Sequence, residues 1–183
     1  MISELSPYIQ SYYKVSDETT WLIRPILNTV FMPFGILGSH LAQNDFNPKL
    51  QYLIGGGLGV LGVFFSSFTT NYHIFVILFP VLFGICSGFT YIVAMNIAWQ
   101  YYPGREGFVS GVIDTSFGLG GAIFGWMMYE MINPEHKEAN SDSYNDDNDD
   151  FPFEEEIANN LPYASRMVAL VWAIMVLLCI ILI

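Results

Sequence analysis

The sequence predicts an all-α membrane protein, and three observations point to that fold class. Charged residues make up 13% of the chain and hydrophobic residues 53%, whereas charged residues make up about 25% of a typical soluble domain. The apolar residues gather in runs long enough to cross a bilayer, for which about 20 residues are needed. The charged residues gather between these runs, as expected because a charge is costly in hydrocarbon.

Each apolar run is predicted to be a helix, because backbone polar groups in hydrocarbon must find hydrogen-bond partners within their own segment. Residues 2–13 form a partial span whose larger side chains follow helical spacing, at Leu5, Tyr8, Ile9, Tyr12 and Tyr13. Full spans are expected over 21–41, 50–69, 72–100, 107–131 and 167–183. Alternating connections then place Lys49 and Arg105 on one side of the membrane.

The two ends of the chain indicate a fragment. The last run has 17 residues, which is near the lower limit for crossing a bilayer. The first segment resembles the end of a helix whose beginning is absent. We therefore expect a six-helix bundle with a truncated first helix, which starts late in one helix and ends in a sixth.

The acidity of the chain belongs to one loop. The net charge is −11, but residues 134–163 hold ten acidic residues and one Lys, a net −9, which leaves seven acidic and five basic residues, a net −2, elsewhere. A segment of this composition cannot bury enough apolar surface to fold. We expect 134–163 to be a disordered acidic loop rather than a cation site, since it lacks the Gly and spacing of an EF-hand.

Glycines recur at spacings that let membrane helices approach closely. Small residues four apart allow backbones to meet, and lipid-embedded helices associate largely through such packing. This pattern predicts helix-packing positions at Gly55, Gly59, Gly84, Gly88, Gly107, Gly111, Gly118, Gly121 and Gly125. A further interpretation is that these faces slide during a conformational change.

Chemical signatures of an enzyme or a cofactor site are missing from the sequence. The glycines of 55–59 lie inside an apolar run, without the strand and the acidic residue of a dinucleotide site. Cys86 and Cys179 lie in apolar runs, where they act as small hydrophobic residues. We expect no catalytic residue, no cofactor, no metal and no nucleic acid partner.

Five polar residues within the spans are candidates for a substrate path or for coupling: Arg24, Asn28, Tyr91, Asn96 and Asp114. An ionisable residue inside a membrane is a functional hypothesis by default, so Asp114 is a candidate for proton coupling or gating. Its alternative is a structural acid that bonds to a neighbouring helix. Arg24 attracts anions at the mouth of a path or extends its charged end to the interface.

The depths of the two charged residues predict no direct contact. Arg24 lies about 5 Å below the start of its span and Asp114 about 10 Å below the start of its own, on opposite faces of the membrane. Across a core of roughly 30 Å they are separated by about 15 Å in depth. The polar side chains of Asn28, Tyr91 and Asn96 line a cavity or bond between helices.

The stretch Trp99 to Gly111, WQYYPGREGFVSG, resembles the loop between helices four and five of the major facilitator superfamily. The closest likeness is to its oxalate/formate antiporter and monocarboxylate transporter-like branch, in which an aromatic-Pro pair, a basic residue and a Gly precede a Gly-rich helix. The helix that continues through Phe117 to Gly125 and the segment Ser6 to Tyr13 also resemble that branch.

This resemblance implies the first half of a twelve-helix transporter, in which two six-helix bundles rock about a central site. It implies a small monocarboxylate or related organic anion as substrate, and a second bundle as partner. It also implies a gating role for Lys49 and Arg105. However, Gln43 and Asn44 stand near the position of the family's Asp-Arg pair, and this departure puts the usual gate ion pairs in doubt.

A different interpretation is a non-transporting membrane scaffold or complex subunit that is complete with six or fewer spans. Both interpretations place the chain in a lipid bilayer as a multi-pass protein, and neither identifies which membrane. The DNA sequence on either side of the coding segment distinguishes them, since a transporter requires six further apolar runs in the same frame.

Overall fold

The computed structural model describes residues 2–139 and 151–182, and within these residues it contains helices and no strand. Five helical segments are long and apolar enough to cross a membrane: Asp17–Gln43, Pro48–Ser66, Tyr72–Tyr101, Glu106–Ile132 and Glu155–Leu182. The predicted all-α fold class is confirmed, and the chain is an integral, multi-pass membrane protein.

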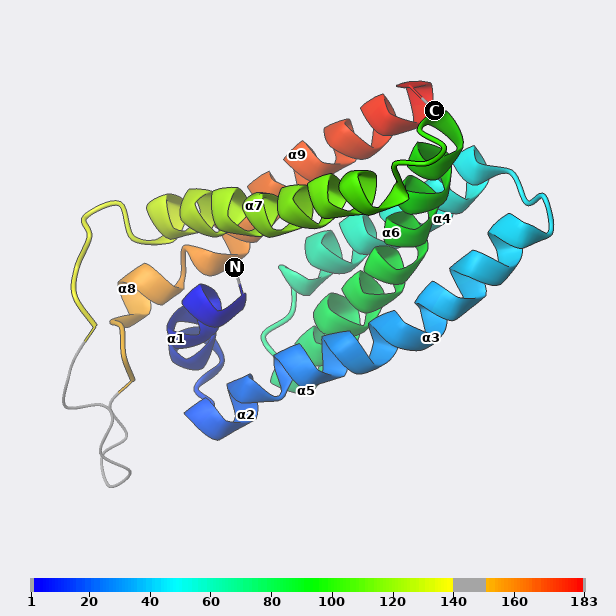
Figure 1. Cartoon of the computed structure of the whole chain (residues 1–183). Helices are drawn as coiled ribbons and strands as arrows, with labels where there is room; N and C mark the ends of the chain where they lie inside the picture. Colours follow the sequence, from blue (N-terminus) through cyan, green and yellow to red (C-terminus); the bar gives the residue numbers. More distant parts are fainter. Residues whose placement is uncertain (1, 140–150, 183) are drawn as a thin grey trace.

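The helices run back and forth between two ends of the bundle (Figure 1). In chain order they are α1 (Ile2–Tyr13), α2 (Asp17–Trp21), α3 (Ile23–Gln43), α4 (Pro48–Ser66), α5 (Tyr72–Val76), the π-helix η1 (Ile77–Val81), α6 (Leu82–Tyr101), α7 (Glu106–Ile132), α8 (Glu155–Ala158) and α9 (Leu161–Leu182). The turns at 44–47 and 102–105 lie at what we call the turn end. The connections at 14–16 and 67–71, together with the described residues 133–139 and 151–154, lie at the opposite, loop end.

Local sequence signals place the helix boundaries. The Asn47 side chain accepts a hydrogen bond from the Lys49 N–H at 2.9 Å, and Pro48 follows as the first residue of α4. Such a cap satisfies a backbone donor that the helix itself leaves free. Gly104, with φ of 80°, makes the turn before α7, a conformation that other residues adopt only with strain.

Several expected boundaries need correction. The span expected at 167–183 begins six residues earlier, at Leu161, so that α9 has 22 residues. The span expected at 50–69 ends at Ser66. The span expected at 72–100 is one continuous path, but five of its residues around Pro80 form a π-helix. Proline has no N–H to donate, so it disturbs the regular hydrogen-bond ladder of an α-helix.

The prediction of a disordered loop over 134–163 is wrong for its second part. Residues 140–150 lie outside the described residues, but 151–163 are folded and include α8. Ile157, Ala158 and Leu161 are buried, because these apolar side chains pack into the hydrophobic core at the loop end. The acidic composition of the whole segment led to the prediction of disorder, although its second part contains these apolar residues.

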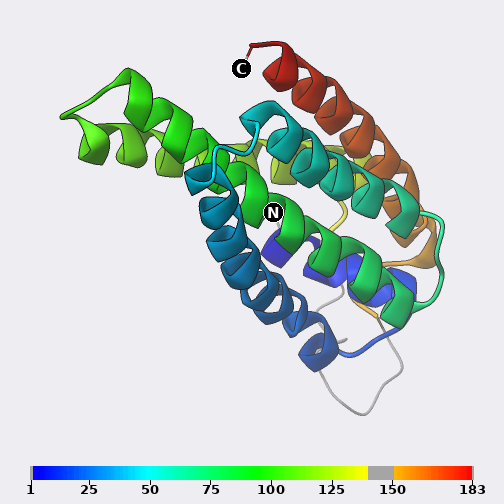
Figure 2. The same cartoon turned by 90° about the vertical axis from the view of Figure 1, so that its right-hand side faces the viewer.

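Helices α3, α4 and α6 pack side by side and form the central layer, with α9 against the outer side of α4 (Figure 2). A Cβ placed at Gly88 would lie 2.8 Å from both the Gly35 nitrogen and the Phe31 carbonyl oxygen of α3. A Cβ at Gly59 would lie 2.5 Å from the Cys86 sulfur. The backbones of α3, α4 and α6 can therefore lie this close together because the glycines at these positions have no side chain.

The glycines of α7 are arranged differently. A Cβ placed at Gly107, Gly111, Gly118 or Gly121 would meet no atom within 4 Å. Close helix packing was predicted at these positions because their glycines have the same four-residue spacing as those of α4 and α6. Within the described residues this face of α7 is open, because α7 crosses the bundle at a distance from α3 (Figure 1). Gly125, in contrast, is buried.

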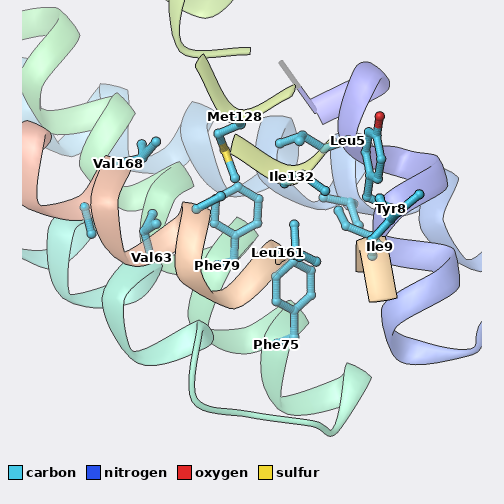
Figure 3. Close-up of a cluster of buried hydrophobic side chains, with 14 residues drawn as sticks. Leu5, Tyr8, Ile9, Val63, Phe75, Phe79, Met128, Ile132, Leu161 and Val168 are labelled. Atoms are coloured by element: carbon cyan, nitrogen blue, oxygen red, sulfur yellow. The ribbon is translucent and has the colours of Figure 1, made fainter. Parts of the chain in front are cut away.

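A cluster of buried apolar side chains lies at the loop end, where α1, α4, α5, η1, α7 and α9 meet (Figure 3). Phe75, Phe79, Phe83 and Trp172 stack successively with ring centroids 5.1–6.0 Å apart. At the edge of this cluster, Arg166 of α9 donates to the Ser67 hydroxyl at 3.2 Å. A cation is favourable there, since the carbonyl groups at the end of α4 carry partial negative charge.

Residues 151–158 form a strap that holds α1 against the bundle. The Phe153 ring stacks on the Tyr8 ring with centroids 4.3 Å apart, and the Phe153 N–H donates to the Ser11 hydroxyl at 3.0 Å. Lys14 and Glu155 form an exposed ion pair, of a type that contributes little in water. The stacked ring is therefore the main attachment of the strap to α1.

We expect Gly88→Ala to lower the free energy of unfolding by about 1–3 kcal/mol, because the added methyl group forces α3 and α6 apart. Gly57→Ala is the matched control, since a Cβ at Gly57 would meet no atom within 4 Å. Alanine favours a helix over glycine by up to about 1 kcal/mol, so the control is expected to be neutral or stabilising. Thermal unfolding in detergent, followed by circular dichroism, measures both. Equal shifts in the two variants would contradict close packing at Gly88.

We expect Phe153→Ala to destabilise the chain by about 2–3 kcal/mol, through lost apolar burial and the lost aromatic pair. It should also expose the strap to protease, so the rate of cleavage within 151–158 is measured beside the unfolding temperature. Phe153→Tyr keeps the stacked ring and serves as control. If Phe153→Ala left both cleavage and unfolding unchanged, the strap would not be holding α1.

Candidate functional site

The candidate site is built around a hydrogen bond between two membrane helices. The Tyr91 hydroxyl of α6 donates to Asp114 Oδ1 of α7 at 2.7 Å. The Tyr91 ring is fixed by edge contacts with Phe31 of α3, at 5.9 Å, and with Phe117 of α7, at 6.2 Å. Because aromatic edge contacts hold the ring, the hydroxyl is presented to the carboxylate in one orientation.

Asp114 lies eight residues into α7, about 12 Å along the helix axis. Among the described residues, Tyr91 is the titratable group that contacts the Asp114 carboxylate. A carboxylate at this depth can accept a proton and so change its charge, and it can hold a polar partner that would otherwise be costly to bury. The pair therefore joins a group that can change charge to an oriented donor.

The other predicted polar residues are not brought to this pair. Arg24 is the second residue of α3, near the loop end, and its side chain is exposed. No ion pair joins it to Asp114 in the described part of the chain. Asn28, one turn further along α3, is exposed, and Asn96 of α6 is half-buried. Tyr91 and Asp114 are thus the two predicted residues that meet.

The predicted gating residues share the turn end. Lys49 lies in the first turn of α4, and Arg105 precedes α7. Both are exposed. The described turns contain no ion pair that involves either residue, and Glu106 accepts instead from the Gly104 N–H at 2.8 Å.

Sequence reasoning missed a second hydrogen bond between α6 and α7. The Trp99 indole N–H donates to the Ser110 hydroxyl oxygen at 3.0 Å. The available signal was the spacing of Ser110 and Asp114, which are four residues apart and therefore lie on one face of a helix. An aromatic donor near the end of the preceding span is the kind of partner that such a face can meet.

The residues that the structure describes contain no group of three His, Cys, Asp or Glu side chains able to hold a metal ion. Near the loop end, the Lys137 ammonium donates a hydrogen bond to the Glu135 carboxylate, and this bond and the charge of that carboxylate raise the pKa of Lys137. Lys137 also lies 3.9 Å from Glu154 of the strap. These contacts belong to the connection between α7 and α8, away from the Tyr91–Asp114 pair.

Comparison with known protein families gives one match, in which the family model of the Major Facilitator Superfamily covers residues 1–125. The similar curated proteins include the following three. Apicoplast pyruvate carrier 1 of Toxoplasma gondii is 30% identical over 107 residues, which are 58% of this chain and 19% of the carrier. Monocarboxylate transporter 14 of Homo sapiens is 32% identical over 113 residues, 62% of this chain and 22% of the transporter. Monocarboxylate transporter 12 of Xenopus laevis is 26% identical over 123 residues, 67% of this chain and 26% of the transporter.

The matched region therefore spans between 19% and 26% of the length of these three relatives. No solved structure matches the chain. The family match covers all of α1 to α6 and most of α7, including both partners of the Tyr91–Asp114 hydrogen bond.

The Tyr91–Asp114 bond predicts an energetic coupling between the two side chains. Tyr91→Phe and Asp114→Ala, singly and together, form a double-mutant cycle for the free energy of unfolding in detergent. We expect a coupling of about 0.6–1.7 kcal/mol, the range for a hydrogen bond between membrane helices. The control cycle replaces Tyr91→Phe by Tyr101→Phe, whose side chain is 77% exposed and which should add independently. Additivity in both cycles would rule out a significant bond.

Proposed function

The chain belongs to the major facilitator superfamily, and from this we propose that it forms one bundle of a transporter for a small monocarboxylate or related organic anion. The proposed mechanism is alternating access, in which this bundle and a second one rock about a central path. The observation that carries the proposal is the Tyr91–Asp114 pair, which places a proton acceptor and an oriented hydroxyl between two spans of the matched region.

The names of the relatives support the substrate class. One is a pyruvate carrier and two are monocarboxylate transporters, so each is named for a small carboxylate. Arg24 supports an anion as well, because a guanidinium pairs with a carboxylate through two parallel hydrogen bonds. Its exposed position near the loop end of α3 suits a group that attracts an anion toward the path.

We assign Asp114 the role of proton site. In its charged form it repels an anionic substrate, since two like charges in a medium of low polarity interact strongly. Uptake of one proton converts the carboxylate to a neutral acid and removes this repulsion. The Tyr91 hydroxyl, no longer held by a carboxylate, is then a donor for the carboxylate of the substrate. Release of the proton on the other side restores the original charge.

The openness of the α7 face supports a second bundle as partner. Phe108, Phe117 and Trp126 of α7 are each at least 59% exposed. We propose that lipid covers part of this surface and that the second bundle, in the same polypeptide or in another chain, faces the rest. Lys49 and Arg105, both at the turn end, remain candidates for contacts that close the path there.

The proposal is tested by uptake of radiolabelled pyruvate, lactate, acetate and oxalate into proteoliposomes. The chain is expressed with any segments that its gene encodes on either side, and a pH gradient is imposed. We expect saturable uptake of at least one anion, faster when the outside is acidic. The absence of saturable uptake of every anion in the panel, in vesicles that contain folded protein, would overturn the transport function.

Asp114→Asn is the critical variant, because an amide is close in shape to a carboxylic acid but takes up no proton. We expect it to remove the acceleration by the pH gradient while substrate exchange continues. Asp45→Asn, an exposed acid in the turn after α3, is the control and should retain the full pH response. A full pH response in Asp114→Asn would exclude Asp114 as the proton site.

A further inference from the structure

We infer that Trp99 and Ser110 are positioning residues for the Tyr91–Asp114 pair. Their hydrogen bond, 3.0 Å between Nε1 and Oγ, is the second direct polar link between α6 and α7 in the described chain. It lies nearer the turn end than the Tyr91–Asp114 bond. The functional consequence drawn below rests on the proposed role of Asp114, but the geometric claim does not.

The direction of this link is determined by chemistry. An indole N–H can only donate, whereas a hydroxyl can donate one hydrogen bond and accept others. The Ser110 hydroxyl donates its own hydrogen to the Glu106 carbonyl oxygen at 2.8 Å, so the lone pairs on its oxygen are free to accept from Trp99. In this hydrogen bond Trp99 is therefore always the donor and Ser110 always the acceptor.

Polar contacts have an unusual importance for α7 because little packing locates its first part. Between Glu106 and Phe124 of this helix, Val109 is the buried residue. A Cβ placed at Gly107, Gly111 or Gly118 would meet no atom within 4 Å. Few side chains interlock between α6 and α7 over this stretch, so the two hydrogen bonds and the Tyr91–Phe117 edge contact set most of the distance between the helices.

Ser110 and Asp114 are four residues apart on one face of α7, with about 6 Å of rise between them. Both accept from long aromatic side chains of α6, which extend across the space between the helices. Because one helical turn is stiff, holding Ser110 also limits where the Asp114 carboxylate can move. Release of Ser110 would allow α7 to roll and would weaken the bond from Tyr91.

Trp99 is 39% exposed and close to the end of its span, where tryptophan also serves as an interfacial anchor. The two roles are separated by Trp99→Phe, which keeps an aromatic ring and removes the donor. Ser110→Ala removes the acceptor from the other side. Ser110→Thr retains the hydroxyl and should behave as the wild type.

The first test is spectroscopic and does not depend on transport. The infrared carboxylate stretch of Asp114 is assigned by its loss in Asp114→Asn, and its displacement in Tyr91→Phe calibrates the loss of the donor. We expect Trp99→Phe and Ser110→Ala to displace the band in the same direction as Tyr91→Phe, and Ser110→Thr to leave it in place. An unmoved band in Trp99→Phe and Ser110→Ala would overturn the inference.

The second test follows uptake of the transported anion against pH. Trp99→Phe and Ser110→Ala should change the response of uptake to pH, because the Tyr91 hydroxyl is no longer held against the Asp114 carboxylate. The ratio kcat/KM should fall by about threefold to twentyfold, which corresponds to one hydrogen bond between membrane helices. The double variant should be no worse than either single one.

Trp21→Phe is the matched control, since Trp21 of α2 is an exposed tryptophan whose indole N–H donates to Asp17, away from α6 and α7. It should alter neither the infrared band nor the pH profile. The infrared band could move in Trp99→Phe although neither the wild type nor any variant shows uptake. In that case the positioning role stands and the transport proposal fails. If uptake occurs but its pH profile is the same in Trp99→Phe and the wild type, the positioning role fails.

Discussion

Close contact between the backbones of α3, α4 and α6 is the constraint on which the rest of this structure depends. Helices in lipid gain little from burying apolar side chains, since the surrounding acyl chains are equally apolar. They gain instead from dispersion contacts, which require the backbones to be near. The closeness of Gly88 to Gly35 and of Gly59 to Cys86 provides those contacts. This layer is therefore a rigid support for the side chains that α6 extends from its other face.

Helix α7 is held in a different way, and the difference explains where a functional site can form. Near the loop end, Met128 and Ile132 are buried in the apolar cluster, which locks that end of α7 in place. Toward the turn end, two hydrogen bonds from aromatic donors and one aromatic edge contact take the place of extensive packing. A helix that is fixed at one end and tied by polar contacts at the other can shift by small amounts. Such a helix is suited to carry a carboxylate whose charge changes during a cycle.

The strap shows how an acidic connection can contribute to the hydrophobic core. Its charged residues lie in water, whereas Phe153 covers Tyr8 and Ile157 is buried with Leu161. The Asn160 side chain also donates to the Ile132 carbonyl oxygen at 3.0 Å, at the end of α7. A short apolar motif within an acidic segment thereby joins α1, α7 and α9 at the loop end, the end opposite to the open face of α7.

The amino-acid sequence alone determined the membrane environment, the helical fold class and the approximate spans, because these follow from the length and composition of apolar runs. The sequence also identified Tyr91 and Asp114 as polar residues at membrane depth. It could not show that they meet, or that Trp99 reaches Ser110, because each contact depends on how α6 and α7 are placed relative to each other.

The glycine pattern was equally strong in α4, α6 and α7, yet it marks close packing in the first two and an open face over most of the third. Only tertiary structure decides this, because the spacing of small residues permits a close approach, whereas the presence of a neighbouring helix determines whether one occurs.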